Sequence, residues 1–331
     1  MRYREVGTSG IEASVIGLGT WAIGGDGFWD KETDDEEAIR TIHAAIDAGI
    51  NLIDTAPGYG RGHSEEVVGK AIKGVPRDKV LISTKCGIVW EGKEGGYMHT
   101  LDGLDYYRNL EPGSMRREAE SSMKRMGIDY IDVLFTHWQS LESFPTPIER
   151  TMGGLLEMRE EGLIRAIGVS NCDLGQMKEY MSSGKIDVNQ PPYSMLTRGI
   201  EGEFLDYCVE EKISVFAYSP LEQGLLTGRI GMDYEPPKGT YREGYLSSYK
   251  AENRRRVLDM LEGWADLTEK YGCGLSQLVI AWTIAQEGVT NALCGARRER
   301  HLAENIAAGD LIIEEGDLMR IRGDVESLVQ E

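Results

Sequence analysis

Cysteine is scarce in this chain, and its few residues form no recognisable pair. The 331 residues include five cysteines, and no two of them lie in a C-x-x-C motif. An odd number of scattered cysteines predicts reduced thiols rather than a disulfide framework. Neither the cysteines nor the five histidines have the spacing of zinc ligands, so we expect no metal site. The cysteines are Cys86, Cys172, Cys208, Cys273 and Cys294.

Long apolar runs and an excess of positive charge are also missing. No apolar run approaches the ~18 residues of a membrane span, and the opening MRYREVGTSG lacks the apolar core of a signal peptide. Lys and Arg number 36 against 55 Asp and Glu, so the net charge is −19. A surface this acidic repels nucleic-acid phosphates and anionic membranes. We therefore expect a cytoplasmic protein with a small-molecule ligand, while the oligomeric state stays open.

A third absence concerns the fold. No G-x-G-x-x-G motif follows an apolar run, which disfavours a pair of Rossmann domains, the rival architecture. Instead, short apolar runs alternate with helical stretches, as parallel strands joined by helical crossovers do. We predict a single (β/α)₈ barrel domain over residues 1–331. The eight runs cover residues 14–19, 51–54, 79–85, 130–137, 164–171, 187–190, 213–219 and 290–295.

Several local signals refine this barrel. Thr33 and Glu36 form a capping-box pattern at the start of the first helix, and Gly49 stops that helix. The opening YREVGTSGIEAS has extended flanks around a turn, which predicts a β-hairpin that closes the barrel floor. Long connections follow the third and seventh strands, at residues 86–113 and 224–253. Loops at the carboxyl ends of barrel strands carry the active sites of this architecture.

Four chemically useful side chains follow neighbouring strands of the predicted barrel. Asp54 and Tyr59 follow the second strand, Lys85 ends the third, and His137 ends the fourth. Each alone is more typical of a turn, a packed aromatic or a solvated charge. Together they suit proton transfer to a carbonyl oxygen, because a nearby ammonium lowers the pKa of a phenol from its usual ~10. A hydrolase with two carboxylates is the weaker interpretation, because Asp54 is the one acid placed at this rim.

The chain resembles the aldo-keto reductases along nearly its whole length. The matching stretches include IGLGTWAIGG, NLIDTAPGYGRGHSEEVVGKAI, VLISTKCG, GLIRAIGVSN, FAYSPLEQGLLTG and GARRERHLAEN. LIDTAPGYG, TKCGIVWE and THWQS are similar to a bacterial branch of that family that includes methylglyoxal reductase. The resemblance implies NAD(P)H-dependent reduction of an aldehyde or ketone. It makes Tyr59 the general acid/base, Lys85 and Asp54 its tuning partners, and His137 the group that orients the carbonyl.

The resemblance also implies a cofactor site and a substrate wall. NADP(H) is favoured over NAD(H) because Arg297 suits a 2′-phosphate. However, Gly295-Ala296 and His301 replace a Lys-Ser pair and an Arg of NADPH-specific members, so we expect NADH to be usable. The substrate wall is expected from Trp21, Trp90 and Trp138. The implied cofactor positions are Ser170, Asn171, Gln190, Tyr218, Ser219, Leu221, Gln223, Gly224, Gly295, Ala296, Arg297, His301, Glu304 and Asn305.

A second function belongs to a different class of protein. Related barrels serve as cofactor-binding regulatory subunits of ion channels, where binding to the partner matters more than turnover. This alternative rests on likeness of fold and cofactor site alone. The sequence offers no basic or apolar segment for such a partner.

Overall fold

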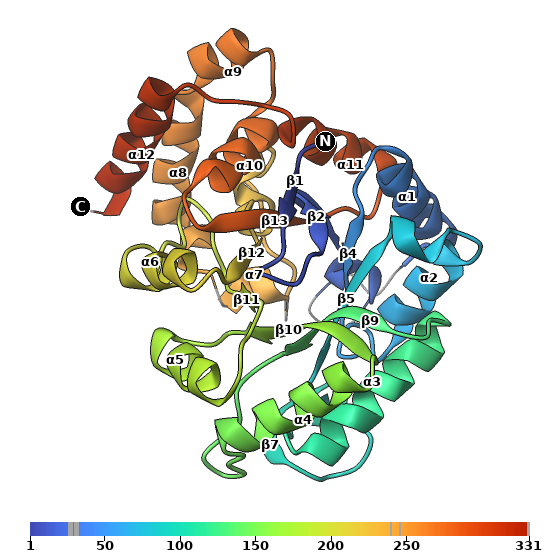
Figure 1. The fold of residues 1–331 in the computed structure, drawn as a ribbon. Coiled ribbons are helices and arrows are strands. Elements are labelled where there is room, and N and C mark those ends of the chain that lie inside the picture. Colours follow the sequence, from blue (N-terminus) through green and yellow to red (C-terminus); the bar gives the residue numbers. More distant parts are fainter. Residues whose placement is uncertain (26–28, 30–32, 239, 245, 330–331) are drawn as a thin grey trace.

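Eight parallel strands close into a barrel in the computed structural model, as predicted (Figure 1). The structure describes residues 1–25, 29, 33–238, 240–244 and 246–329. Neighbouring barrel strands follow one another in sequence, and each of the eight predicted apolar runs overlaps one of them. The barrel strands are β3 (Ile16–Gly19), β4 (Leu52–Asp54), β5 (Leu81–Cys86), β9 (Ile131–Thr136), β10 (Ile164–Ser170), β11 (Val188–Gln190), β12 (Ser214–Tyr218) and β13 (Val289–Gly295).

Helices surround the barrel and bury their apolar faces against the strands (Figure 1). The first helix begins one residue later than the capping-box pattern predicts. Asp34, not Thr33, is its cap, because the Asp34 carboxylate accepts a hydrogen bond from the Glu37 N–H at 2.9 Å. The helices are α1 (Asp35–Asp47), α2 (His63–Ile72), α3 (Pro112–Met126), α4 (Ile148–Glu160), α5 (Leu174–Ser183), α6 (Glu203–Glu210), α8 (Ala251–Glu262), α9 (Ala265–Tyr271), α10 (Leu275–Ala285), α11 (Glu299–Ala308) and α12 (Glu315–Val329).

The N-terminal hairpin closes the floor of the barrel. Its strands β1 (Tyr3–Glu5) and β2 (Glu12–Ser14) pair antiparallel and lie across the middle of the barrel in Figure 1. Val6 and Ile11 join the apolar cluster that fills the barrel interior. At Gly7 the backbone has φ +58°, and a Cβ there would lie 2.6 Å from the carbonyl oxygen of Asp187. Only glycine allows the turn to sit this close to the barrel.

The two long connections have different structures. Residues 86–113 contain a three-stranded antiparallel sheet of β6 (Ile88–Val89), β8 (Leu104–Arg108) and β7 (Gly96–Leu101). Asp102 and Gly103 form its two-residue turn, both with positive φ. The connection at 224–253 is mostly irregular, with a short helix α7 (Tyr241–Gly244), and residues 239 and 245 lie outside the described residues. Both connections stand at the carboxyl ends of the strands they follow.

Candidate active site

A buried ion pair lies where β4 and β5 end. The Nζ atom of Lys85 is 2.8 Å from Oδ2 of Asp54, and the two residues are 1% and 3% exposed. Lys85 also donates to the carbonyl oxygen of Thr55 at 2.9 Å. Ser83 and Gln190 donate to Oδ1 of Asp54 at 2.8 and 2.9 Å, so the neighbouring strand β5 and the non-adjacent strand β11 both hold the carboxylate.

Burial and the ion pair act on Lys85 in opposite directions. Burial lowers the pKa of the Lys85 ammonium, and the adjacent carboxylate of Asp54 opposes that change. An ammonium removed from water keeps its charge only with such a partner. Asp54 therefore secures a positive charge beneath the mouth of the barrel.

Tyr59 lies directly over this charge. The ammonium of Lys85 is 4.9 Å from the centre of the Tyr59 ring, within cation–π range. The imidazole of His137 meets the same ring edge-on, at 5.9 Å between centroids and 83° between planes. Trp21 stacks on its other side at 6.0 Å and 27°. The structure thus brings together all four side chains that the sequence places at the rim.

The turn that carries Tyr59 is held by two glycines. A Cβ on Gly60 would lie 2.0 Å from the carbonyl oxygen of Gly24, and a Cβ on Gly24 would lie 2.6 Å from the backbone of Tyr59. Gly60 also has φ +62°. Close contact between the loops after β3 and β4 therefore fixes the Tyr59 backbone, and no larger residue fits there.

The surroundings of His137 favour its neutral form. Burial, and next the positive charges of Lys85 and Arg108, hold the pKa of His137 well below its usual range. A neutral imidazole has one N–H donor and one acceptor nitrogen. It can therefore donate a hydrogen bond to a carbonyl oxygen without adding a second full charge beside Lys85.

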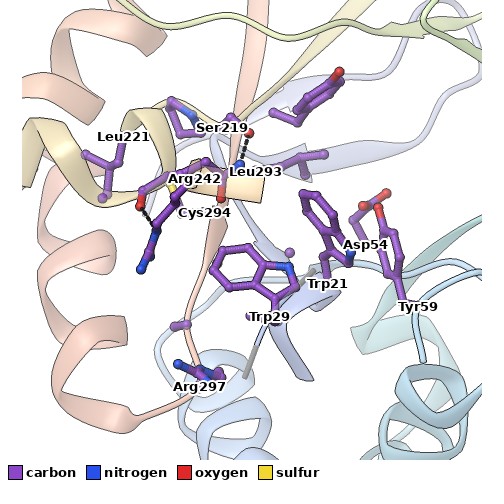
Figure 2. A pocket seen from close by; sticks show the side chains of 18 of the residues that line it. Trp21, Trp29, Asp54, Tyr59, Ser219, Leu221, Arg242, Leu293, Cys294 and Arg297 are labelled. Atoms are coloured by element: carbon purple, nitrogen blue, oxygen red, sulfur yellow. Dashed lines mark hydrogen bonds between the residues drawn. The ribbon is translucent and has the colours of Figure 1, made fainter. Parts of the chain in front are cut away.

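A cavity of about 600 Å³ extends from this group across the barrel mouth. Tyr59 and His137 line one end, and all fourteen positions implied for the cofactor also line it. Figure 2 shows Tyr59, Asp54 and Trp21 on one side of the cavity and Arg297 on another. Its size and mixed lining suit an elongated organic ligand.

The middle of the cavity is built by the ends of β10 and β12. Tyr218 donates its hydroxyl to Oδ1 of Asn171 at 2.8 Å, and Nδ2 of Asn171 donates to the carbonyl oxygen of His137 at 2.9 Å. Ser219 and Gln223 both have positive φ, and the Gln223 amide donates to the Ser219 hydroxyl at 2.7 Å. These contacts fix Tyr218 and its loop in place before any ligand arrives.

The far end of the cavity contains charges and an unsatisfied donor. Nδ2 of Asn305 is buried and has no hydrogen-bond partner among the described residues. Arg229 pairs with Glu304, which also accepts from Ser276 at 3.3 Å. Arg297 lines the cavity nearby. An unpaired amide beside guanidinium groups fits the polar and anionic parts of a nucleotide.

Only two of the three predicted tryptophans line the cavity. Trp21 and Trp138 do, and the guanidinium of Arg108 lies 4.8 Å above the Trp138 ring. Trp90 is not among the described residues of the lining, although its ring contacts Tyr106, a lining residue, at 6.3 Å between centroids. Trp90 as a substrate wall therefore stays a prediction.

Several lining residues have no counterpart in the sequence prediction. The three-stranded sheet contributes Ile88, Met98, His99, Leu101 and Tyr106. The Asp102-Gly103 pair between apolar and aromatic residues is a hairpin signal that predicts this sheet. No such signal marks Trp29, Arg229, Tyr234 and Arg242, which come from the connections after β3 and β12.

Comparison with known proteins gives consistent results. The chain is 44% identical to the "NADH-specific methylglyoxal reductase" of Escherichia coli (strain K12) over 328 residues, 99% of each chain. It is 31% identical to a "probable voltage-gated potassium channel subunit beta" of Arabidopsis thaliana, covering 94% of this chain and 92% of that one. The solved glycerol dehydrogenase of Gluconobacter oxydans superposes with a TM-score of 0.86 at 32% identity, covering 98% and 94% of the two chains.

The match to a whole family agrees with these individual relatives. No described helix has the length and apolar character that crossing a membrane requires. Residues 15–323 match the aldo/keto reductase family, so the match spans the barrel from its first strand to the last helix. The chain therefore belongs to the aldo/keto reductase family.

Proposed function

We propose that this protein reduces a small aldehyde or ketone to its alcohol at the Tyr59 end of the cavity. The observation that carries the proposal is the position of the Tyr59 ring, 4.9 Å from the Lys85 ammonium and edge-on to His137. When bound, NADH or NADPH supplies the hydride that adds to the carbonyl carbon. Family membership and the relative named as a methylglyoxal reductase support this reaction class.

Each of the four side chains at the rim has a separate role in the proton transfer. Tyr59 gives its phenolic proton to the carbonyl oxygen as that oxygen gains charge, and water later restores the proton. The positive charge of Lys85 stabilises the resulting phenolate, and Asp54 keeps Lys85 charged and in place. Neutral His137 donates a hydrogen bond to the same oxygen, which orients the carbonyl toward Tyr59.

The described residues also fit the dinucleotide. Tyr218 presents an aromatic ring whose hydroxyl Asn171 fixes, so it suits stacking against a nicotinamide. Unpaired Nδ2 of Asn305 and the guanidinium of Arg297 suit the adenosine end. Gln190 also holds the catalytic-end carboxylate, because its amide N–H donates to Asp54 at 2.9 Å. Its amide oxygen remains for contact with the carboxamide, since Gln190 lines the cavity.

The proposal predicts turnover of small carbonyl compounds. The purified protein should oxidise NADH or NADPH in the presence of methylglyoxal, and more slowly with acetaldehyde and propanal, which have no second oxygen for the rim to bind. The measurement is the loss of reduced-cofactor absorbance with each compound of this panel. Absence of turnover with every aldehyde and ketone tested would overturn the proposal.

Arg297 is predicted to decide how well NADPH binds. Arg297→Ala should raise the Kd for NADPH by about 10–100-fold, the effect of losing a hydrogen bond to a charged group. The Kd for NADH should change less than about threefold, because NADH has no 2′-phosphate. Titration of protein fluorescence with each cofactor measures both constants.

Arg298→Ala is the matched control for the cofactor experiment. Arg298 is the adjacent cation, but it is exposed, pairs with Glu37 at 3.5 Å and is not among the described lining residues. Its removal should leave both constants nearly unchanged. Equal weakening of NADPH and NADH binding by Arg297→Ala would argue against contact with the 2′-phosphate.

The similarity to a potassium channel subunit supports a second candidate, a cofactor-binding regulatory subunit. In that case the cavity would bind the dinucleotide, and turnover would be slow or absent. The higher identity to the relative named as a reductase, 44% against 31%, favours the enzyme. The carbonyl panel and a size measurement with candidate membrane-protein partners separate the two.

We place the protein in a reducing compartment, the cytoplasm. All five cysteines are free thiols, and four of them are buried. Burial raises the pKa of the Cys294 thiol, which lies beside the cavity, to about 12. Such a thiol stays protonated and unreactive, so it is a packing group rather than a nucleophile.

A further inference from the structure

The small sheet of β6, β8 and β7 joins the barrel where its two ends meet. Gly87, the first residue after β5, accepts a hydrogen bond on its carbonyl oxygen from the Asn109 N–H at 3.2 Å. Gly87 has φ +93°, and a Cβ there would lie 2.5 Å from the Leu110 side chain, so only glycine fits. The next residue, Ile88, is buried and lines the cavity. The backbone at Gly87 therefore sets where this wall of the cavity begins.

A carboxyl group on α3 holds this junction from outside the insertion. The Gly87 N–H donates to both oxygens of Glu118, at 3.1 Å to Oε1 and 3.0 Å to Oε2. Glu118 lies in the first half of α3 and is partly buried. A backbone N–H away from water needs an acceptor, and the Gly87 N–H lies between the end of β5 and the start of β6. Glu118 supplies that acceptor.

Glu118 shares its surroundings with a second acid and one cation. Glu65 on α2 is fully buried and accepts from Nε of Arg125 at 2.6 Å, so this guanidinium is already paired. Burial raises the pKa of Glu118 to about 8, although the N–H groups of Gly87 and Ile88 oppose the rise, and the charge of Glu65 adds to it. A carboxyl group with this pKa is mostly protonated at pH 7. A neutral amide therefore resembles it closely in size and in charge.

We propose that Glu118 is a positioning residue that fixes the cavity wall against which the carbonyl substrate binds. Its contact with Gly87 sets the backbone direction into Ile88, and the rest of the sheet follows because β8 pairs with both β6 and β7. Glu118 thus acts on substrate binding without touching the substrate. The ion pair with Asp54 holds Lys85 separately, so the chemical step does not depend on Glu118. This inference rests on the proposed function, since it assumes that the cavity reduces a carbonyl.

The decisive variant is Glu118→Leu, which removes the acceptor and keeps a side chain of similar size. It should raise the KM for methylglyoxal by about tenfold, the effect of leaving one buried N–H unpaired. Both kcat and the Kd for NADH should stay within about twofold, because only the substrate wall has moved. A merely structural role would not separate KM from kcat in this way.

Two further variants at the same position test the acceptor itself. Glu118→Gln keeps one acceptor oxygen, so its KM should return to within about threefold of the unaltered protein. Glu118→Asp withdraws the carboxyl group by one methylene and adds no apolar surface, so its KM should rise by about threefold. This variant tests the inference even where leucine disturbs folding.

Hydrogen exchange reports the contact without any substrate. In Glu118→Leu and Glu118→Asp, the amides of peptides that contain Gly87 and Ile88 should exchange faster than in the unaltered protein, by about tenfold in the leucine variant. Peptides from the barrel strand β9 should exchange at the unaltered rate.

Glu120 provides a matched control on the same helix. It is exposed, and residues two positions apart on a helix do not share a face. Glu120→Leu makes the same chemical change away from Gly87. It should leave the KM for methylglyoxal and the exchange of Gly87 and Ile88 unchanged.

The outcomes distinguish this inference from the proposed function. Failure of the unaltered protein to reduce any carbonyl would overturn the proposed function itself. Normal turnover by the unaltered protein, with Glu118→Leu and Glu118→Asp indistinguishable from Glu120→Leu in KM, would overturn only the positioning role. A loss that falls on kcat, or that Glu118→Gln does not restore, would overturn it as well. The result expected is a raised KM and faster exchange at unchanged kcat in Glu118→Leu, both reversed in Glu118→Gln.

Discussion

Replacing Tyr59 with phenylalanine will lower kcat for carbonyl reduction by about 10²–10⁴-fold, the usual contribution of a positioned acid–base group. The variant loses one oxygen atom and the proton that it carries. The ring itself remains, so its contacts with Lys85, His137 and Trp21 persist. Steady-state turnover of methylglyoxal, with NADH and with NADPH, is the measurement.

Tyr59→Phe should slow the chemical step and leave cofactor binding nearly unchanged. Nothing in Tyr59→Phe alters the middle or the far end of the cavity, so the Kd for either cofactor should change by less than about twofold. Tyr3→Phe makes the same substitution on the hairpin at the barrel floor, where the hydroxyl donates to Gly49 at 2.8 Å. That control should keep full activity. Retention of more than about a tenth of kcat by Tyr59→Phe would remove Tyr59 from its proposed role.

Replacing Lys85 with methionine will cost both activity and stability. Methionine approximates the length of the lysine side chain but leaves the Asp54 carboxylate without its ion-pair partner at 3% exposure. Removing one charged partner of a buried ion pair typically lowers the free energy of unfolding by about 3–5 kcal/mol. Tyr59 also loses the charge that favours its phenolate, so kcat should fall by about 10²–10⁴-fold.

A second variant separates the two effects of Lys85. The double variant Lys85→Met with Asp54→Leu removes both charges, so it should regain part of the lost stability, as buried pairs replaced by apolar residues do. It should not regain activity. The shift of the urea unfolding midpoint and kcat report the two effects. Equal stability of Lys85→Met and the unaltered protein would show that the pair is not energetically important.

The barrel and the candidate catalytic residues at its rim are largely predictable from local sequence. Strand-length apolar runs between helical stretches specify the topology, because only a parallel sheet buried on both faces uses them in this order. Asp54, Lys85 and His137 follow from the same reasoning, since carboxyl ends of parallel strands meet at one rim. The ion pair between Asp54 and Lys85, and the distances of Lys85 and His137 from the Tyr59 ring, do not follow from the sequence and are known only from the structure.

Loop residues were harder to predict because they follow no period. Trp29 and Arg242 come from two connections that are far apart in the sequence, and only the closed barrel brings them together. The role of Trp90 is open for the same reason. Its type suggests a substrate wall, and its ring packs on Tyr106 of the small sheet, which lines the cavity. The first helix shows a smaller error, since Thr33 and Asp34 are both good caps and sequence does not choose between them.

The small sheet of β6, β8 and β7 has a consequence for how such an enzyme diversifies. The groups proposed for proton transfer stand on or directly after barrel strands, whereas much of the wall facing them belongs to this insertion within residues 86–113. The insertion pairs only with itself and not with a barrel strand among the described residues. This segment can therefore be exchanged as a unit, in evolution or by protein engineering. Such an exchange changes the preferred carbonyl substrate and leaves the residues proposed for proton transfer unaltered.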